Sequence, residues 1–466
     1  MEQSDTNLNT GETMYRRTPL FWAAENGHEE VVRILLERTD INIEAVDTYG
    51  RTPLCVAAEN GHAGVVRALV EGCANLNTHD IYGRTPLSLA ADAEDTEVVG
   101  ILLELDDVDP NIADQRGQTP LSLAVENEDE EVVTMLLQRN DVNPSTTGNG
   151  NQTPLSCAAE NGYEGIVRIL VQQSKADLNR ADPMCGQTPL ARASENGHSG
   201  IVRFLLEQND VDPDPADNCG RTPLWKAALR GHEEVVKMLL ERNEVNPDTT
   251  DRYKDTPLSV AALGGHEGVA RMLLERNDVN PNNASDCGNT PLTLAARWGH
   301  EGVVQRLLER NNINPSMADS QDGRTPLLWA AWNAHTGVVR MLLKRNDVNP
   351  EAADRSGQTP LCWAALNGDE ATVRLLLDQD SVNPNMAGED GQTPLLQAAR
   401  YRNDGVVSIL LGRDDLIIDT TDNSGRTAAS WAAENMDDRI AKLLSDWADF
   451  SSQPPPKRSA GFDTQS

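Results

Sequence analysis

Residues 47–77 read DTYGRTPLCVAAENGHAGVVRALVEGCANLN. Asp47 and Gly50 occupy the first and fourth positions of a four-residue segment, as is typical of a type I turn. Thr52 is suited to cap the amino end of a helix, and Pro53 suits the first helical position. Gly61 predicts the end of that helix, because glycine readily adopts the left-handed conformation found there. The stretch therefore predicts a turn followed by a short helix.

A second helix is expected after Gly61, because the stretch from Val65 to Val70 is apolar apart from Arg67. Ala57 and Ala58 keep the first helix thin, so that a neighbouring helix can approach closely. Neither helix can bury its apolar face alone, whereas stacked copies would bury a continuous core.

The same pattern recurs along the chain. The triplet Thr-Pro-Leu begins at Thr18, Thr52, Thr85, Thr119, Thr153, Thr188, Thr222, Thr256, Thr290, Thr325, Thr359 and Thr393, and a degenerate copy begins at Thr427. Successive copies lie 33 to 35 residues apart. A period of this length predicts a repeat architecture with one helix pair per copy.

The shared pattern, D-x-x-G-x-T-P-L-x-x-A-A-x-x-G-H-x-x-V-V-x-x-L-L, resembles the ankyrin repeat and covers residues 14–447. The segments ENGHEEVVRILLER and NDVNP are similar to those of the long, self-similar arrays common in filamentous fungi. The resemblance implies an all-α repeat solenoid of about 13 stacked repeats, each a helix-turn-helix with a protruding β-hairpin loop, in a curved superhelix.

The expected organisation has three parts. Residues 1–13 are polar and are predicted to be disordered, residues 14–450 form the solenoid of 13 repeats, and residues 451–466 form a flexible tail containing Pro454, Pro455 and Pro456. The first repeat is expected to lack its leading hairpin and to leave Phe21 and Trp22 without a covering repeat. Either the amino-terminal segment folds over it, or the chain is the end of a larger protein.

The chain departs from the family pattern at one position. Ankyrin repeats usually have His directly after Thr-Pro-Leu, where it helps to join adjacent repeats. That position holds Phe21, Cys55, Ser88, Ser122, Ser156, Ala191, Trp225, Ser259, Thr293, Leu328, Cys362 and Leu396. We therefore expect different hydrogen bonds between repeats, with Ser, Thr or Cys replacing part of the usual set.

Composition excludes several functions. With 73 Asp and Glu against 40 Lys and Arg, the chain has a formal net charge of −33, which opposes direct binding of nucleic acid or of anionic membranes. No apolar run is long enough for membrane insertion, and the first residues do not resemble a signal peptide. The seven cysteines are scattered, which predicts reduced thiols and a location in the cytoplasm or the nucleus.

The spacing of the candidate catalytic and metal-binding residues does not match a known catalytic or metal-binding motif. Seven histidines stand ten residues after a repeat Thr, and four of them precede Glu, as in His28-Glu29. The second His that a zinc protease needs is replaced, for example by Val32. We interpret these histidines as hydrogen-bonding between repeats. No phosphate loop, dinucleotide fingerprint or nucleophile motif is present, so neither an enzyme nor a cofactor is predicted.

The repeats differ most at the seventh and eighth residues after each Thr, near the end of the first helix. In the first six repeats the seventh residue is acidic: Glu25, Glu59, Asp92, Glu126, Glu160 and Glu195. In the later repeats apolar, aromatic and basic residues replace the acids. We predict a protein-binding stripe on the concave face, formed by Leu229, Arg230, Leu263, Arg297, Trp298, Trp332, Leu366, Arg400 and Tyr401. By contrast, Trp22, Trp329, Trp363 and Trp431 stand four residues after the Thr and are predicted to pack in the core.

The sequence therefore predicts a non-catalytic, monomeric scaffold or adaptor that binds another protein or peptide. Two alternatives stay open. The repeats could be the recognition region of a larger signalling or innate-immunity-like protein, or the chain could regulate a transcription factor.

Overall fold

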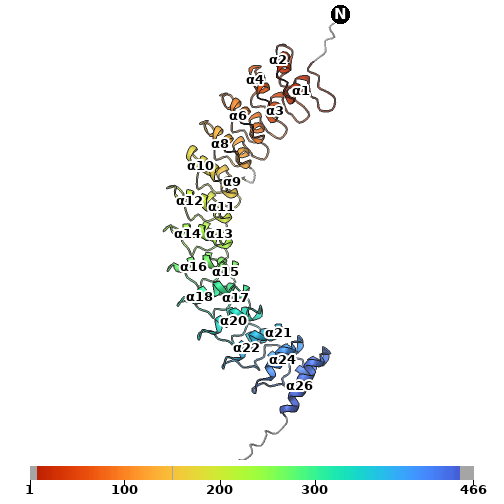
Figure 1. Cartoon of the computed structure of the whole chain (residues 1–466), viewed down its shortest axis with the longest axis vertical. Coiled ribbons are helices and arrows are strands. Elements are labelled where there is room, and N and C mark those ends of the chain that lie inside the picture. Colours follow the sequence, from red (N-terminus) through yellow and green to blue (C-terminus); the bar gives the residue numbers. More distant parts are fainter. Residues whose placement is uncertain (1–7, 149–150, 452–466) are drawn as a thin grey trace, which may run out of the picture. The chain divides into compact units, whose positions relative to one another are not determined.

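The computed structural model describes residues 8–148 and 151–451, which form two compact units with the division between Asn246 and Pro247. The described residues form 26 helices and no strand. Within each unit the helices pair as expected, with a short helix followed by an antiparallel partner. In each unit the odd-numbered helices form one layer and the even-numbered helices form the other (Figure 1). These pairs confirm a repeat solenoid of about 13 repeats.

Unit 1 contains seven pairs within its described residues. The first helices of the pairs are α1 (Pro19–Glu25), α3 (Pro53–Glu59), α5 (Pro86–Asp92), α7 (Pro120–Glu126), α9 (Pro154–Asn161), α11 (Pro189–Asn196) and α13 (Pro223–Arg230). Their partners are α2 (Glu29–Leu36), α4 (Ala63–Glu71), α6 (Thr96–Leu103), α8 (Glu130–Leu137), α10 (Glu164–Gln173), α12 (Ser199–Leu206) and α14 (Glu233–Leu240).

Unit 2 contains six pairs in the part that the structure describes. The first helices are α15 (Pro257–Gly264), α17 (Pro291–Trp298), α19 (Pro326–Trp332), α21 (Pro360–Asn367), α23 (Pro394–Arg400) and α25 (Ala428–Glu434). Their partners are α16 (Glu267–Glu275), α18 (Glu301–Leu308), α20 (Thr336–Leu343), α22 (Glu370–Leu377), α24 (Asp404–Leu411) and α26 (Asp438–Ser451). We call the odd-numbered set the inner helices and the even-numbered set the outer helices.

Local sequence explains where the inner helices begin. The Thr52 hydroxyl accepts the backbone N–H of Cys55 at 3.2 Å, which satisfies one of the free donors of the first turn. Each of the other repeat threonines caps its inner helix in the same way, and from α1 to α23 a proline fills the first helical position. The predicted helix starts are therefore confirmed.

The core runs between the two layers of each unit. Ala57, Ala58 and Val66 are completely buried, and Leu54 is almost so. The two alanines let α3 pack closely against both α1 and α5. Burial of such positions in every repeat provides the hydrophobic stabilisation that a single helix pair lacks.

The hairpin loops contain tight turns, without strands among the described residues. Asp47 accepts the backbone N–H groups of Tyr49 and Arg51, at 2.8 and 3.0 Å. Successive loops are joined by one backbone bond, such as that from Ile81 N–H to the Tyr49 carbonyl at 2.9 Å. Asp47 is buried, and Arg51 neutralises it at 2.9 Å.

The first repeat has a leading turn, so the expectation that it lacks one is wrong. Glu12 takes the place of the usual Asp and accepts the N–H groups of Met14 and Tyr15. The Tyr15 carbonyl then accepts the N–H of Thr48, as Tyr49 does one repeat later. The turn was not predicted because the repeat pattern begins with Asp, whereas this turn begins with Glu12. The first hairpin thus begins at Glu12, before the predicted boundary at residue 14.

The first helix pair still exposes apolar side chains, including Trp22, Val31 and Ile34, which are 43, 46 and 63 % exposed. In later repeats the equivalent face is covered by the preceding helix pair. Of the predicted disordered segment and tail, residues 1–7 and 452–466 lie outside the described residues.

Candidate protein-binding surface

The inner helices of unit 2 bring most of the predicted stripe into one register. Leu263 lies on α15, Arg297 and Trp298 end α17, Trp332 ends α19, Leu366 lies on α21, and Arg400 ends α23 just before Tyr401. The side chains of Trp298 and Tyr401 are 55 and 48 % exposed, whereas Trp332 and Leu366 are half-buried. Leu229 and Arg230 end α13 in unit 1 and belong to that unit's surface.

Three tryptophans stack in the middle of unit 2. The ring of Trp332 lies 5.2 Å from that of Trp329, nearly parallel at 3°, and 4.6 Å from that of Trp363, at 12°. The indole N–H groups of Trp329 and Trp363 donate to buried hairpin carboxylates, those of Asp319 at 2.8 Å and Asp354 at 3.0 Å. These two bonds fix the rings of Trp329 and Trp363, and the Trp332 ring stacks on both of them.

The four tryptophans predicted to pack in the core differ in burial. Trp329 and Trp431 are each 6 % exposed, which confirms their assignment, and Trp363 is half-buried. Trp22 is 43 % exposed, and among the described residues no helix pair precedes the first repeat to cover it. Trp332, predicted to belong to the surface, is shared between the surface and the tryptophan stack.

Two arginines lie on the faces of these rings. The guanidinium carbon of Arg324 is 3.6 Å from the centre of the Trp332 ring, and that of Arg297 is 4.1 Å from the Trp329 ring. Arg324 also pairs with Asp322 at 2.9 Å. Arg297 forms no ion pair among the described residues, so its positive charge is balanced only by the aromatic face.

A cavity of about 630 Å³ opens at this point of the inner surface. Its walls include Arg297, Trp298, Arg324, Trp329, Trp332 and His335. It combines flat apolar walls with a guanidinium group that has spare hydrogen-bond donors. Such a cavity can hold an apolar side chain beside a carboxylate.

The acidic positions of the early repeats have a structural role that the sequence analysis missed. The side chain one residue before the repeat Thr donates to the acid eight residues later, as from Arg51 to Glu59 at 2.7 Å. The same link joins Arg17 to Glu25, Gln118 to Glu126, Gln152 to Glu160 and Gln187 to Glu195. The recurrence of Arg or Gln eight residues before each Glu was a detectable signal. These acids therefore join the hairpin to the inner helix, and where the donor is Arg17 or Arg51 the charge of the acid is also neutralised.

Two cations, one buried and one partly buried, strengthen this network in unit 1. Lys226, 1 % exposed, lies 2.8 Å from Glu195 and 3.4 Å from Asp217. Arg192 bridges Glu160 at 2.5 Å and Asp182 at 3.1 Å. Burial alone would raise the pKa of Glu195, but the bond from Lys226 lowers it below its ordinary value. Basic residues at a position that is apolar in most repeats were the available signal.

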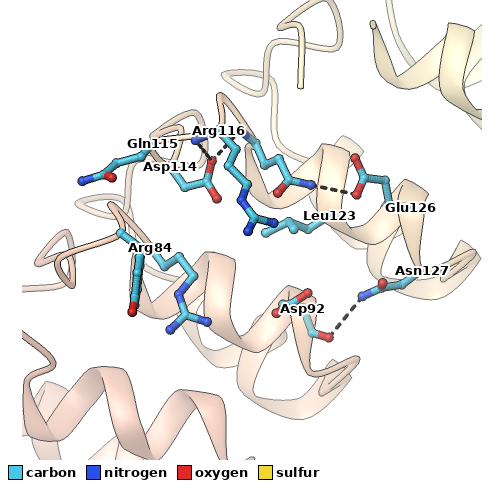
Figure 2. Close-up of a pocket in the computed structure, with 10 residues that line it drawn as sticks. Arg84, Asp92, Asp114, Gln115, Arg116, Leu123, Glu126 and Asn127 are labelled. Carbon is cyan, nitrogen blue, oxygen red and sulfur yellow. Dashed lines mark hydrogen bonds between the residues drawn. The ribbon is translucent and has the colours of Figure 1, made fainter. Parts of the chain in front are cut away.

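A second cavity, of about 440 Å³, lies on the inner surface of unit 1 between the third and fourth repeats (Figure 2). Its walls hold Arg84, Asp92, Arg116 and Glu126, and the side chain of Arg116 extends from its hairpin into the cavity. Asn127 and Gln118 bond across its floor to the Asp92 carbonyl and the Glu126 carboxylate, at 3.1 and 2.7 Å. Its lining is mainly polar and of mixed charge, which makes it a weaker site for an apolar anchor.

Comparison with known proteins agrees with this architecture. The family model described as ankyrin repeats (3 copies) matches overlapping segments that together cover residues 2–453, namely 2–80, 20–114, 71–146, 105–182, 139–217, 174–251, 209–283, 242–319, 275–354, 313–387, 342–417 and 361–453. The chain belongs to the ankyrin-repeat family. No curated protein matches it. Among solved structures, it is similar to the ankyrin repeat domain of Bcl-3, described as a unique member of the IkappaB protein family, with 26 % identity and a TM-score of 0.44 over 49 % of this chain and 99 % of that one.

This ankyrin-repeat chain joins its repeats through the histidine that stands ten residues after the repeat Thr. The ring Nε2–H of His300 donates to the Leu263 carbonyl of the preceding repeat at 3.1 Å, and that of His335 donates to the Arg297 carbonyl at 3.1 Å. His62, His198 and His232 make the equivalent bond. The interpretation of these histidines as ties between repeats is confirmed. The Ser residues after Thr-Pro-Leu instead bond within their own repeat, as Ser259 does to Thr256.

Two of the cysteine thiols are held in an unreactive state. Burial raises the pKa of the Cys157 and Cys362 thiols to about 11, which keeps both protonated at neutral pH. Among the described residues, no cluster of three His, Cys, Asp or Glu side chains is arranged to hold a metal ion. Within residues 8–148 and 151–451, no helix has both the length and the apolar character needed to cross a membrane.

Proposed function

We propose that the inner surface of unit 2 binds an acidic and hydrophobic segment of another protein, and that the chain acts as a non-catalytic scaffold or adaptor. The family supports the general class, because ankyrin repeats mediate protein–protein interaction. The observation on which the proposal rests is that Arg297, which forms no ion pair among the described residues, lies beside the exposed Trp298 in a cavity walled by tryptophans.

The contacts favour this chemistry in two ways. The exposed ring of Trp298 offers a flat apolar anchor, and tryptophan and arginine dominate protein-binding hot spots. The Arg297 guanidinium group already lies on the Trp329 face, so little side-chain entropy is lost when it binds a carboxylate. A carboxylate next to an aromatic side chain on the partner would satisfy both groups at once.

The electrostatic setting favours binding at close range. The formal net charge of −33 repels an acidic partner at a distance, but at physiological salt this repulsion is screened beyond about 8 Å. Locally, Arg297 and Arg400 present positive charge between apolar rings. We therefore expect slow association and a strong requirement for direct contact.

The test uses a synthetic peptide with one tryptophan flanked by glutamates, titrated against the full chain by calorimetry in 0.15 M salt. Replacing both free arginines, Arg297→Gln with Arg400→Gln, should weaken binding by about tenfold or more, because each charge-assisted contact contributes about 1–2 kcal/mol. A matched double variant, Arg340→Gln with Arg374→Gln, removes the same charge from exposed positions on the outer helices α20 and α22.

The control should bind like the original chain, and a peptide with lysines in place of the glutamates should not bind. Equal weakening by both double variants would show that only net charge matters and would refute this site. Failure of the acidic peptide to bind at all would refute the proposed function.

A further inference from the structure

The arginine and aromatic arrangement on unit 2 occurs twice. Arg297 and Trp298 end the inner helix α17, and three repeats later Arg400 ends α23 and Tyr401 follows it, at the same distances from the repeat Thr. Each of these arginines lies over a tryptophan of the next inner helix. The guanidinium carbon of Arg297 is 4.1 Å from the Trp329 ring centre, and that of Arg400 is 5.0 Å from the Trp431 ring centre.

Each copy also has a second arginine, which comes from the hairpin and lies over the same tryptophan. Arg324 lies 4.8 Å from the Trp329 ring, and Arg426 lies 3.7 Å from the Trp431 ring. The hairpin arginines are neutralised, by Asp322 at 2.9 Å and by Asp422 at 3.1 Å. Their role is to hold the tryptophan ring in place.

The helix arginines differ, because within the part of the chain that the structure describes neither Arg297 nor Arg400 forms an ion pair. Each stands directly before an exposed aromatic residue, Trp298 at 55 % and Tyr401 at 48 %. Each copy therefore presents one uncompensated guanidinium beside one exposed ring. The two inner helices between them end in Trp332 and in Leu366 followed by Asn367, so neither adds a positive charge there.

The spacing of the two copies is fixed by the repeat. Arg297 and Arg400 are separated by three repeats of the same unit. Adjacent helices pack about 8–10 Å apart, so the two copies lie roughly 25–30 Å from each other. An extended chain covers that distance with about eight or nine residues.

We propose that these copies are two equivalent subsites that bind two acidic and aromatic clusters of one partner segment, about eight or nine residues apart. The inference rests on the proposed function and adds the number of subsites and their spacing. The first subsite consists of Arg297, Trp298 and Trp329, and the second of Arg400, Tyr401 and Trp431. Two weak contacts on one chain raise each other's effective concentration, so the pair binds much more tightly than either alone.

The test compares three peptides by calorimetry on the full chain. The first carries a single Glu-Trp-Glu cluster. The other two carry a pair of such clusters, joined by a flexible Gly-Ser linker of about three or about twelve residues, of which only the longer can span the gap. We expect two copies of the one-cluster peptide to bind per chain. The long-linker peptide should bind one per chain, at least about tenfold more tightly than the short-linker peptide.

Single variants separate the subsites. Arg297→Gln and Arg400→Gln should each reduce binding of the long-linker peptide to about the affinity of the one-cluster peptide, and should each leave one binding site for the latter. Both side chains are at the surface, and melting temperatures should confirm that the variants fold. A one-cluster peptide that binds at a single site, or two-cluster peptides whose affinity is independent of linker length, would overturn the two-subsite inference while leaving the proposed function standing. Absence of binding by every peptide would overturn both.

Discussion

The Arg324 guanidinium lies 3.6 Å from the centre of the Trp332 ring. In unit 1 the residues at the same two positions of the second repeat, Arg51 and Glu59, form an ion pair of 2.7 Å instead. The hairpin arginine is common to both repeats, and only its partner eight residues later differs. Exchange of Glu for Trp at this one position therefore replaces a structural ion pair by an aromatic side chain that lines the cavity. The change from acidic to aromatic residues alters the inner surface without altering the helix pair.

This relationship predicts the behaviour of Trp332→Glu. The new carboxylate should pair with Arg324, as Glu59 does with Arg51, and recover part of the stability lost with the ring stack. We expect Trp332→Glu to be about 1 kcal/mol more stable to urea than Trp332→Ala, with both unable to bind the acidic peptide tightly. Urea unfolding of the two variants tests this, and equal stability would contradict it.

The bond between repeats predicts which substitutions of His300 are tolerated. Asn403 occupies the equivalent position and donates to the Leu366 carbonyl at 2.8 Å, as His300 does to Leu263. His300→Ala should therefore lower the free energy of unfolding by about 1 kcal/mol, whereas His300→Asn should cost less than half of that. The reciprocal change, Asn403→His, serves as a control and should be nearly neutral. A larger loss for Asn than for Ala would disprove the shared role.

Strained residues predict a stabilising substitution in the third repeat. Glu94 has a φ of 58° at the position where Gly61 has 71°. Relief of this left-handed backbone should make Glu94→Gly about 0.5–1 kcal/mol more stable. Ala334 has a φ of 57°, so Ala334→Gly should give a similar gain without a change of charge. If only the Glu94 variant is stabilised, charge and not backbone strain is the cause.

The same strain predicts uneven opening along the chain. Glu94 and Glu128 end the inner helices of the third and fourth repeats in the left-handed region, whereas Gly265 and Gly299 do so in the eighth and ninth. Acidic side chains also crowd the third and fourth repeats, and like charges repel at low salt. Amide hydrogen exchange should therefore be faster in α5 to α8 than in α15 to α18. Greater protection of α5 to α8 would refute this prediction.

A buried carboxyl group predicts a pH dependence. Burial raises the pKa of Asp214 to about 6, from an ordinary value of 3.8. One carboxyl oxygen accepts the N–H of Asn246 at 3.1 Å, and the other has no hydrogen-bond partner among the described atoms. At the equivalent position the amide group of Asn179 donates to the Asp210 carbonyl at 2.6 Å. Asp214 therefore favours its protonated form in the folded chain.

The sign of the effect follows from the raised pKa. Below about pH 4 the group is protonated in both states and carries no penalty, and as the pH rises through about 6 the folded state loses stability. Asp214→Asn should remove this loss and raise the free energy of unfolding at pH 7.5 by about 1 kcal/mol, a value reduced for partial solvent exposure. Urea unfolding at pH 4 and at pH 7.5 checks this. A gain of equal size at both values would show that ionisation is not the cause.

Sequence predicted the features whose causes are local. The threonine cap of each inner helix and the proline of α1 to α23 lie within one turn of each other, and the alanine pairs indicate close packing of neighbouring helices. The stacking of Trp332 between Trp329 and Trp363 was not predicted, because Trp363 comes from the next repeat and its ring position depends on a bond to Asp354. A residue-by-residue comparison of repeats shows that a position changes, but it does not show which neighbour compensates for the change.

The acidic face of the early repeats illustrates the same limit. The acids were correctly located at the ends of the inner helices, yet Glu160 is bonded to Arg192 of the following repeat and Glu195 to Lys226. Partners 31 or 32 residues away are invisible to a search for local motifs. Likewise, the sequence does not show that Arg297 and Arg400 of unit 2 lack an ion pair among the described residues, because this depends on the positions of the acidic side chains in neighbouring repeats.

The ties between repeats span a nearly constant number of residues. Asn111 bonds to groups 30 and 32 residues later, Arg139 to a carbonyl 36 residues earlier, and His335 to one 38 residues earlier. A genetic duplication or deletion of one full period, wherever its breakpoints fall, leaves each of these donors opposite an equivalent acceptor. Unequal recombination can therefore lengthen or shorten this array without a special sequence where the repeats join. The inner surface then gains or loses the exposed side chains of one inner helix at a time.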